Sequence, residues 1–144
     1  ADNTIRTIDE KYHRLLPTAK VIGGNEDQGQ WEVMLRSLAA WRSFNWLKKG
    51  RLDPSGVADF LIFDERMPRS INFCYRQLKS NLDNLSNIYG RVYESSKIAS
   101  EIVDGLNNNR SKNIHKINLK DFIGDHIAKN HELSLKVAID FNLN

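Results

Sequence analysis

Apolar residues recur at spacings of three and four along most of this 144-residue chain, and this spacing constrains its fold more than any other feature. Ile5, Ile8, Tyr12 and Leu15 form the first such series. Spacing of this kind places the apolar side chains on one face of an α-helix. The alternating apolar–polar pattern that is typical of a β-strand never extends beyond four residues. The sequence therefore predicts an all-α fold.

The same spacing predicts a bundle of about six helices. They are expected over residues 1–16, 30–48, 54–63, 68–85, 88–107 and 119–141. Asp53 and Pro54 give the strongest start signal, because Asp favours the N-cap and Pro the first helical position. We expect the helices to pack in a single domain that spans residues 1–144.

Other helix ends are marked by proline and asparagine. Pro68 suits the first position of the fourth helix. The asparagine-rich residues 107–113 favour a loop, because Asn prefers caps and turns. Asn118 and Asp121 approximate a capping box at the start of the last helix. Val92 is expected on the inner face of the fifth helix.

Composition limits the class of protein. The net charge of +3 is too small to indicate nucleic-acid binding on its own. The single cysteine, Cys74, excludes an intramolecular disulfide and a cysteine-cluster zinc site, and we expect it to be buried as a small apolar side chain. No apolar run approaches the ~20 residues that a membrane helix needs, and the residues after Ala1 do not resemble a signal peptide. We expect a cytoplasmic protein with no membrane span.

Asp9 and His13 are the first candidates for chemistry. They are four residues apart on the first helix, so Asp9 could orient the imidazole of His13 as half of a general-base arrangement. The alternative is an ordinary surface pair that stabilises the helix by a few tenths of a kcal/mol. Arg6 lies within reach of both Asp9 and Glu10.

A second polar group surrounds Pro68. At a helix N-terminus, free backbone N–H groups and the Arg69 side chain could hold a carboxylate or phosphate, with Ser70 and Arg66 nearby. The structural alternative is that Asp64 caps the helix and pairs with Arg69.

Signals for metals, cofactors and nucleic acid are weak. His126 and His131 are five residues apart and do not share a helix face as paired zinc ligands do. No phosphate-binding loop is found, so we assign neither a metal nor a cofactor. Cations and tryptophans alternate near residue 45, as in single-strand nucleic-acid platforms, although tryptophans also suit helix packing. These residues are Trp41, Arg42, Trp46, Lys48, Lys49 and Arg51.

Five segments, taken in order, resemble the Alpha-E family, alpha-helical domains that carry a Glu–Arg motif. The segments are residues 4–17 (TIRTIDEKYHRLLP), Gln30–Trp31, Arg51–Pro54, Phe60–Asp64 and Pro68–Cys74. The resemblance covers about residues 1–90 well. It implies that the Glu–Arg pair precedes Ala1 and that family members are about twice as long, so we expect this chain to be the C-terminal part of a longer protein.

The resemblance implies a functional context rather than a reaction. Genes of this bacterial family lie beside circularly permuted ATP-grasp ligases and transglutaminase-like peptidases, so we expect a non-catalytic helical partner of such a system. The alternatives are an enzyme that uses Asp9 and His13 as acid and base, and a nucleic-acid-binding module. We also expect a peptide or carboxylate ligand and formation of a homodimer. The binding candidates are Asp2, Arg6, Tyr12, Asp64, Arg69 and Ser70.

Overall fold

A computed structural model describes residues 1–15, 25–48, 52–110 and 118–143. All regular secondary structure in these residues is helical, which confirms the all-α prediction. The helices are α1 (Asp2–Leu15), α2 (Asn25–Ser37), α3 (Trp41–Lys48), α4 (Pro54–Phe63), α5 (Ile71–Tyr89), α6 (Glu94–Arg110) and α7 (Leu119–Asp140). In these residues, no helix is sufficiently long and apolar to cross a membrane.

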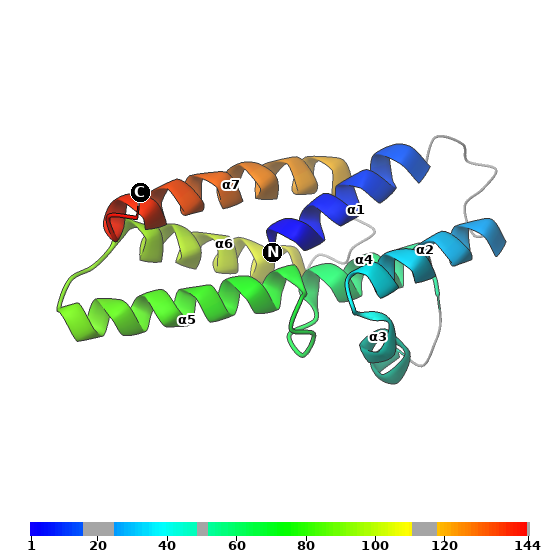
Figure 1. Ribbon diagram of the computed structural model, residues 1–144, viewed down its shortest axis with the longest axis horizontal. Coiled ribbons are helices and arrows are strands. Elements are labelled where there is room, and N and C mark those ends of the chain that lie inside the picture. The colour runs from blue at the N-terminus through cyan, green and yellow to red at the C-terminus, as the bar shows by residue number, and fades with distance from the viewer. Residues whose placement is uncertain (16–24, 49–51, 111–117, 144) are drawn as a thin grey trace.

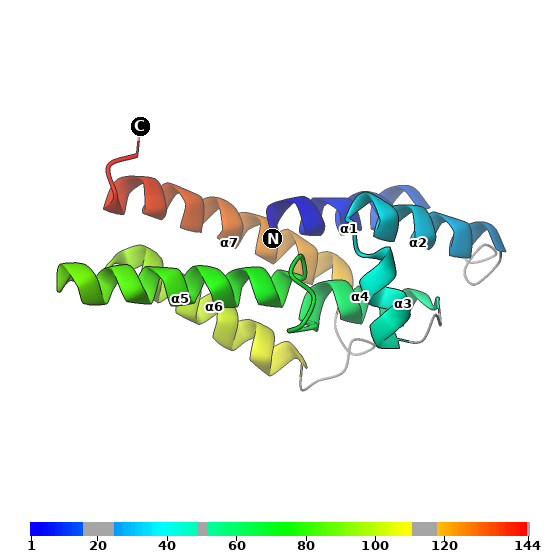
Figure 2. The same cartoon turned by 60° about the horizontal axis from the view of Figure 1, so that its bottom comes forward.

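Three long helices form the length of the molecule. Figure 1 shows α5, α6 and α7 side by side, and α1 beside the first half of α7. The N-terminus therefore lies near the middle of the bundle, whereas α5 and α7 both end at the end that carries the C-terminus (Figure 1). The shorter α2, α3 and α4 gather at the opposite end, as the turned view in Figure 2 also shows.

One continuous hydrophobic core joins the two ends. Ile5 and Ile8 of α1 are buried in it, as the spacing of the first helix predicted. The Phe44 and Phe60 rings meet edge to face with centroids 5.3 Å apart and join α3 to α4. Although α4 has only 10 residues, its fully buried Phe60, Leu61 and Ile62 supply much of the core at its end of the molecule.

The expected single helix over residues 30–48 is two helices, and the expected number of six was therefore too low for the residues described. Ala39 has a φ of 51°, and the N–H groups of Ala39 and Ala40 donate to the carbonyls of Arg36 and Leu35 at 2.9 and 2.7 Å. This is a Schellman ending, in which Ala39 takes the left-handed position that glycine usually fills. Leu35 and Ala40, which flank the turn, are both fully buried from solvent, as is common at this type of helix ending.

Several other helix boundaries also differ from the prediction. The helix expected from Pro68 begins at Ile71, and that expected from residue 88 begins at Glu94. Val92 precedes α6 and is 72% exposed, so its expected place in the core was wrong. Residues 107–109, expected in a loop, belong to the last turn of α6. Asp53 and Asn118 do cap their helices as predicted, accepting from the N–H groups three residues later.

Candidate functional site

The start of α1 is tied to α7 by polar contacts. Arg6 Nε lies 3.0 Å from Asp2 Oδ2, which gives Arg6 a partner that the sequence reasoning did not consider. Asp2 Oδ1 also accepts a hydrogen bond from Asn130 Nδ2 at 3.0 Å. Two of the expected binding residues, Asp2 and Arg6, therefore meet on α1, and Asp2 also joins that helix to α7.

Only one member of the proposed acid–base pair has a side chain among the described residues. Asp9 is half-buried on α1. Tyr12 and His13 belong to the same helix, but their side chains lie outside the described residues. A pairing of Asp9 with His13 therefore stays a prediction.

A string of buried polar side chains continues from Asn130 into the bundle. The Tyr75 hydroxyl donates to Asn130 Oδ1 at 3.1 Å, and the Tyr75 ring lies 6.2 Å from the ring of His126. His126 is 4% exposed and packs on Phe122 with ring centroids 4.2 Å apart. This burial, with a smaller contribution from nearby Lys129, lowers the pKa of His126 to about 4. The imidazole is therefore neutral near pH 7.

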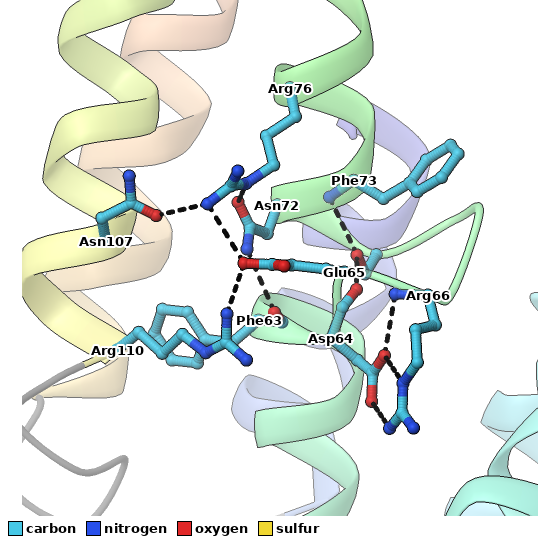
Figure 3. Close-up of polar contacts among 10 residues, drawn as sticks. Phe63, Asp64, Glu65, Arg66, Asn72, Phe73, Arg76, Asn107 and Arg110 are labelled. Carbon is cyan, nitrogen blue, oxygen red and sulfur yellow. Dashed lines mark hydrogen bonds and ion pairs between the residues drawn. The ribbon is translucent and has the colours of Figure 1, made fainter.

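The hydrogen bonds and ion pairs in the turn between α4 and α5 differ from those expected (Figure 3). Asp64 pairs with Arg66, not with Arg69: Arg66 Nη2 donates to Asp64 Oδ2, and the Arg66 backbone N–H to Asp64 Oδ1, both at 2.9 Å. Burial alone would raise the pKa of Asp64, but the hydrogen bonds from Arg66 outweigh it and lower that pKa. Asp64 therefore remains ionised. It is the C-cap of α4 and not the N-cap of α5.

Ser70 is the N-cap of α5. Its fully buried Oγ donates to the Asp64 carbonyl at 2.5 Å and accepts from the Phe73 N–H at 3.0 Å. Arg69 contributes its backbone rather than its charge, because its carbonyl accepts from Thr4 Oγ1 at 2.8 Å while its side chain is exposed. The expected residues Asp64, Arg69 and Ser70 therefore join α1, α4 and α5 together.

A cluster of charged groups beside this turn was missed by the sequence reasoning. Glu65 Oε1 is 3.1 Å from Arg76 Nη2 in α5 and 2.5 Å from Arg110 Nη1 in α6. Arg76 Nη2 also donates to Asn107 Oδ1 at 2.8 Å, and its Nε donates to Asn72 Oδ1 at 3.1 Å (Figure 3). The residues come from three separate segments, so no local pattern could reveal the cluster.

Arg76 also lines an open groove between α5 and α6. The groove has a volume of about 490 Å³, within the ~300–1,000 Å³ typical of small-molecule sites. Its other lining residues are Lys79, Ser80, Asp83, Asn84 and Val103. Lys79 Nζ lies 2.5 Å from Asp83 Oδ2, so the groove offers both signs of charge along one face of α5.

The basic and aromatic residues near residue 45 divide into two kinds. Trp41 is half-buried and lies 5.0 Å under the guanidinium of Arg36, which fits the packing interpretation. Trp46 is 82% exposed, so the expectation that it packs within the fold was wrong. Lys48 pairs with Asp59 at 3.3 Å. Lys49 and Arg51 lie outside the described residues.

The histidines and the cysteine are dispersed. His126 is buried and His131 is exposed. Across the ranges that the structure describes, no group of three or more His, Cys, Asp or Glu side chains is placed to hold a metal ion. Cys74 is half-buried and donates to the Pro68 carbonyl at 3.6 Å, so the expectation of complete burial was too strong.

The chain matches the family model described as Alpha-E, a predicted alpha-helical domain with a conserved ER motif, over residues 1–141. The match spans nearly the whole chain, so the protein belongs to the Alpha-E family. It confirms the resemblance seen in the first 90 residues and extends it to the helices that follow. No curated protein and no solved structure is significantly similar to the chain.

Proposed function

We propose that this member of the Alpha-E family is a non-catalytic helical docking module of a peptide- or amide-forming system. Its proposed partners are a circularly permuted ATP-grasp ligase and a transglutaminase-like protein, the context that the family resemblance implies. The observation that carries the docking role is a concentration of exposed apolar side chains at one end of the bundle.

Eight large apolar side chains are exposed in the described parts of the chain, and six of them lie near the ends of α5 and α7. We call these six the apolar end: Ile88, Tyr89, Val92, Leu135, Ile139 and Leu143. Both helices finish at the same end of the molecule (Figure 1). The rings of Tyr93 and Phe141, 4.6 Å apart, hold the start of α6 against the end of α7.

Exposed apolar side chains that gather in one region are typical of protein interaction sites, whereas scattered ones are ordinary. Three residues on α5 and the turn after it, and three on α7 and just beyond it, present apolar groups to solvent. A protein partner that covered them would gain about 25 cal/mol of binding free energy for each Å² of apolar surface removed from water.

The contacts of the polar candidates also support a docking role. Asp64 is engaged by Arg66, Ser70 caps α5, and Asp2 joins α1 to α7. These side chains stabilise the turn and the helix contacts. Rigid helices held in this way form a suitable frame for a binding surface.

Affinity capture from cells that make the protein tests the proposal. We expect an ATP-grasp ligase, identified by mass spectrometry, to be recovered with the wild-type chain. The variant Leu135→Ser/Ile139→Ser should lose it, because both changes remove exposed apolar groups from the apolar end. Val33→Ser is the matched control, since Val33 is an exposed apolar residue on α2.

Retention of the ligase by Val33→Ser together with its loss from the double variant supports the proposal. Recovery of the ligase by the double variant at the wild-type level contradicts it, as does capture that contains no ligase. Both substituted positions are exposed, so circular dichroism should show the same helix content in all three proteins.

A further inference from the structure

We propose that Arg76 and Arg110, together with the groove along α5, bind the carboxylate end of a short polar peptide. The inference deepens the proposed function, because a module of a peptide-forming system has a use for a site that holds a peptide acid. It stands on different residues from the apolar end, so either can fail without the other.

The two arginines carry more positive charge than Glu65 neutralises. Both guanidinium groups approach the same oxygen, Oε1, of that one carboxylate. Asn72, Asn107 and Glu65 together engage Nε and Nη2 of Arg76, which leaves its Nη1 group for a ligand, while Glu65 meets Arg110 through Nη1. The side chains of Arg76, Arg110 and Glu65 are between 42% and 49% exposed, so a ligand in solvent can reach them.

The groove begins at Arg76 and follows two turns of α5. Its lining residues from Arg76 to Asn84 span ~12 Å at 1.5 Å per residue, the length of three or four extended peptide units. Ser80 and Asn84 offer hydroxyl and amide groups that can both donate and accept, as a peptide backbone requires. Val103 of α6 adds an apolar contact. The lining therefore suits a polar chain more than an apolar ligand.

Charge balance favours a carboxylate over a phosphate. The groove lining contains the cations Arg76 and Lys79 and the anion Asp83. The ion pairs beside Arg76 add the anion Glu65 and the cation Arg110. The sum is +1, which one carboxylate neutralises. A phosphate monoester carries about −1.5 to −2 near pH 7 and would add repulsion from the two acidic side chains.

Titration of the full chain with N-acetyl-trialanine tests the site, with N-acetyl-trialanine amide and inorganic phosphate as comparison probes. The side-chain Nε–H signals of arginine in NMR spectra report binding directly. We expect the peptide acid to shift the Arg76 and Arg110 signals saturably and the peptide amide to leave them unchanged. The Arg36 signal is an internal control, because Arg36 is exposed and paired with a single carboxylate, Glu32.

Substitution then identifies the residues that bind. Arg76→Gln and Arg110→Gln should each weaken binding of the peptide acid by roughly tenfold, the loss expected for a hydrogen bond to a charged group. Arg36→Gln should leave the affinity unchanged. If one arginine variant does not retain the helical signal of the wild type, the other still tests the site.

Three results would overturn the inference: no shift at Arg76 and Arg110, equal binding of acid and amide, or equal weakening by Arg36→Gln. Tighter binding of inorganic phosphate than of the peptide acid would also overturn it and assign the site to a phosphate group. No ligase is present in this titration, so its failure leaves the docking proposal untouched, and failure of the ligase capture leaves the titration untouched.

Discussion

Ser70→Ala is expected to destabilise the fold more than loss of a helix cap usually does. The Ser70 hydroxyl is fully buried, accepts from the Phe73 N–H and donates to the Asp64 carbonyl. Loss of the cap costs about 1 kcal/mol, and leaving a buried polar group without its partner costs about 1–3 kcal/mol. We therefore expect the free energy of unfolding to fall by about 2–4 kcal/mol in total.

Urea denaturation followed by circular dichroism measures this change. With a slope of about 2 kcal/mol per M, the middle of the usual range, the midpoint should fall by roughly 1–2 M while the slope stays constant. Asn118→Ala is the matched control, because Asn118 is an exposed N-cap whose hydrogen bond to the Asp121 N–H is 3.4 Å long. It should cost less than about 1 kcal/mol. Equal losses in the two variants would refute the reasoning, because they would show that burial of the cap adds nothing.

Three further predictions follow from the bundle. Burial lowers the pKa of His126 from 6.5 to about 4, so between these pH values the unfolded chain binds a proton that the folded chain does not. The free energy of unfolding should therefore be constant above about pH 6.5 and fall by about 3 kcal/mol as the pH is lowered to 4. Denaturation at both pH values should show a smaller loss in His126→Gln, and an equal loss would contradict this. Tyr75→Phe should lower the free energy of unfolding by about 1 kcal/mol, because it removes the hydrogen bond to Asn130. Since Asn130→Ala removes the same hydrogen bond, the losses of the two variants should not add in the double variant. The isolated chain should self-associate with rising concentration in sedimentation experiments, and Leu135→Ser/Ile139→Ser should shift it towards the monomer; identical profiles would argue against a role of the apolar end.

Local signals were sufficient where neighbouring residues determine the structure. Asp53 caps α4 because its side chain reaches the Gly56 N–H three residues later, and Pro54 follows it as the sequence predicted. The apolar stripe of α1 likewise predicts which face of that helix is buried. In both cases the decisive contacts are local or follow from helical periodicity.

Tertiary contacts decided the features that were missed. Nothing near Ala39 signals a helix end, since alanine favours helix and no glycine is present; burial of Leu35 and Ala40 on both sides of the turn stabilises it. In the turn between α4 and α5, Pro68 was expected to start a helix, but the hydroxyl of Ser70 donates to the Asp64 carbonyl, and α5 starts after Ser70.

The candidate site was harder to predict than the fold. Glu65 and Arg110 are 45 residues apart, and only the packing of α6 against α5 brings them together. Asp64 was expected to cap α5 and pair with Arg69, but it ends α4 and pairs with Arg66. Which arginine reaches which carboxylate depends on the path of the turn, and a sequence pattern does not contain that path.

Hydrogen–deuterium exchange of the chain with and without a purified ATP-grasp ligase tests the docking role most directly. The account predicts slower exchange on addition of the ligase in residues 85–93 and 132–143, which carry the apolar end. Residues 31–46, which contain the exposed Val33 and Trp46, should exchange at the same rate in both samples. Unchanged exchange throughout, or protection confined to residues 31–46, would contradict the proposal that the partner binds the apolar end.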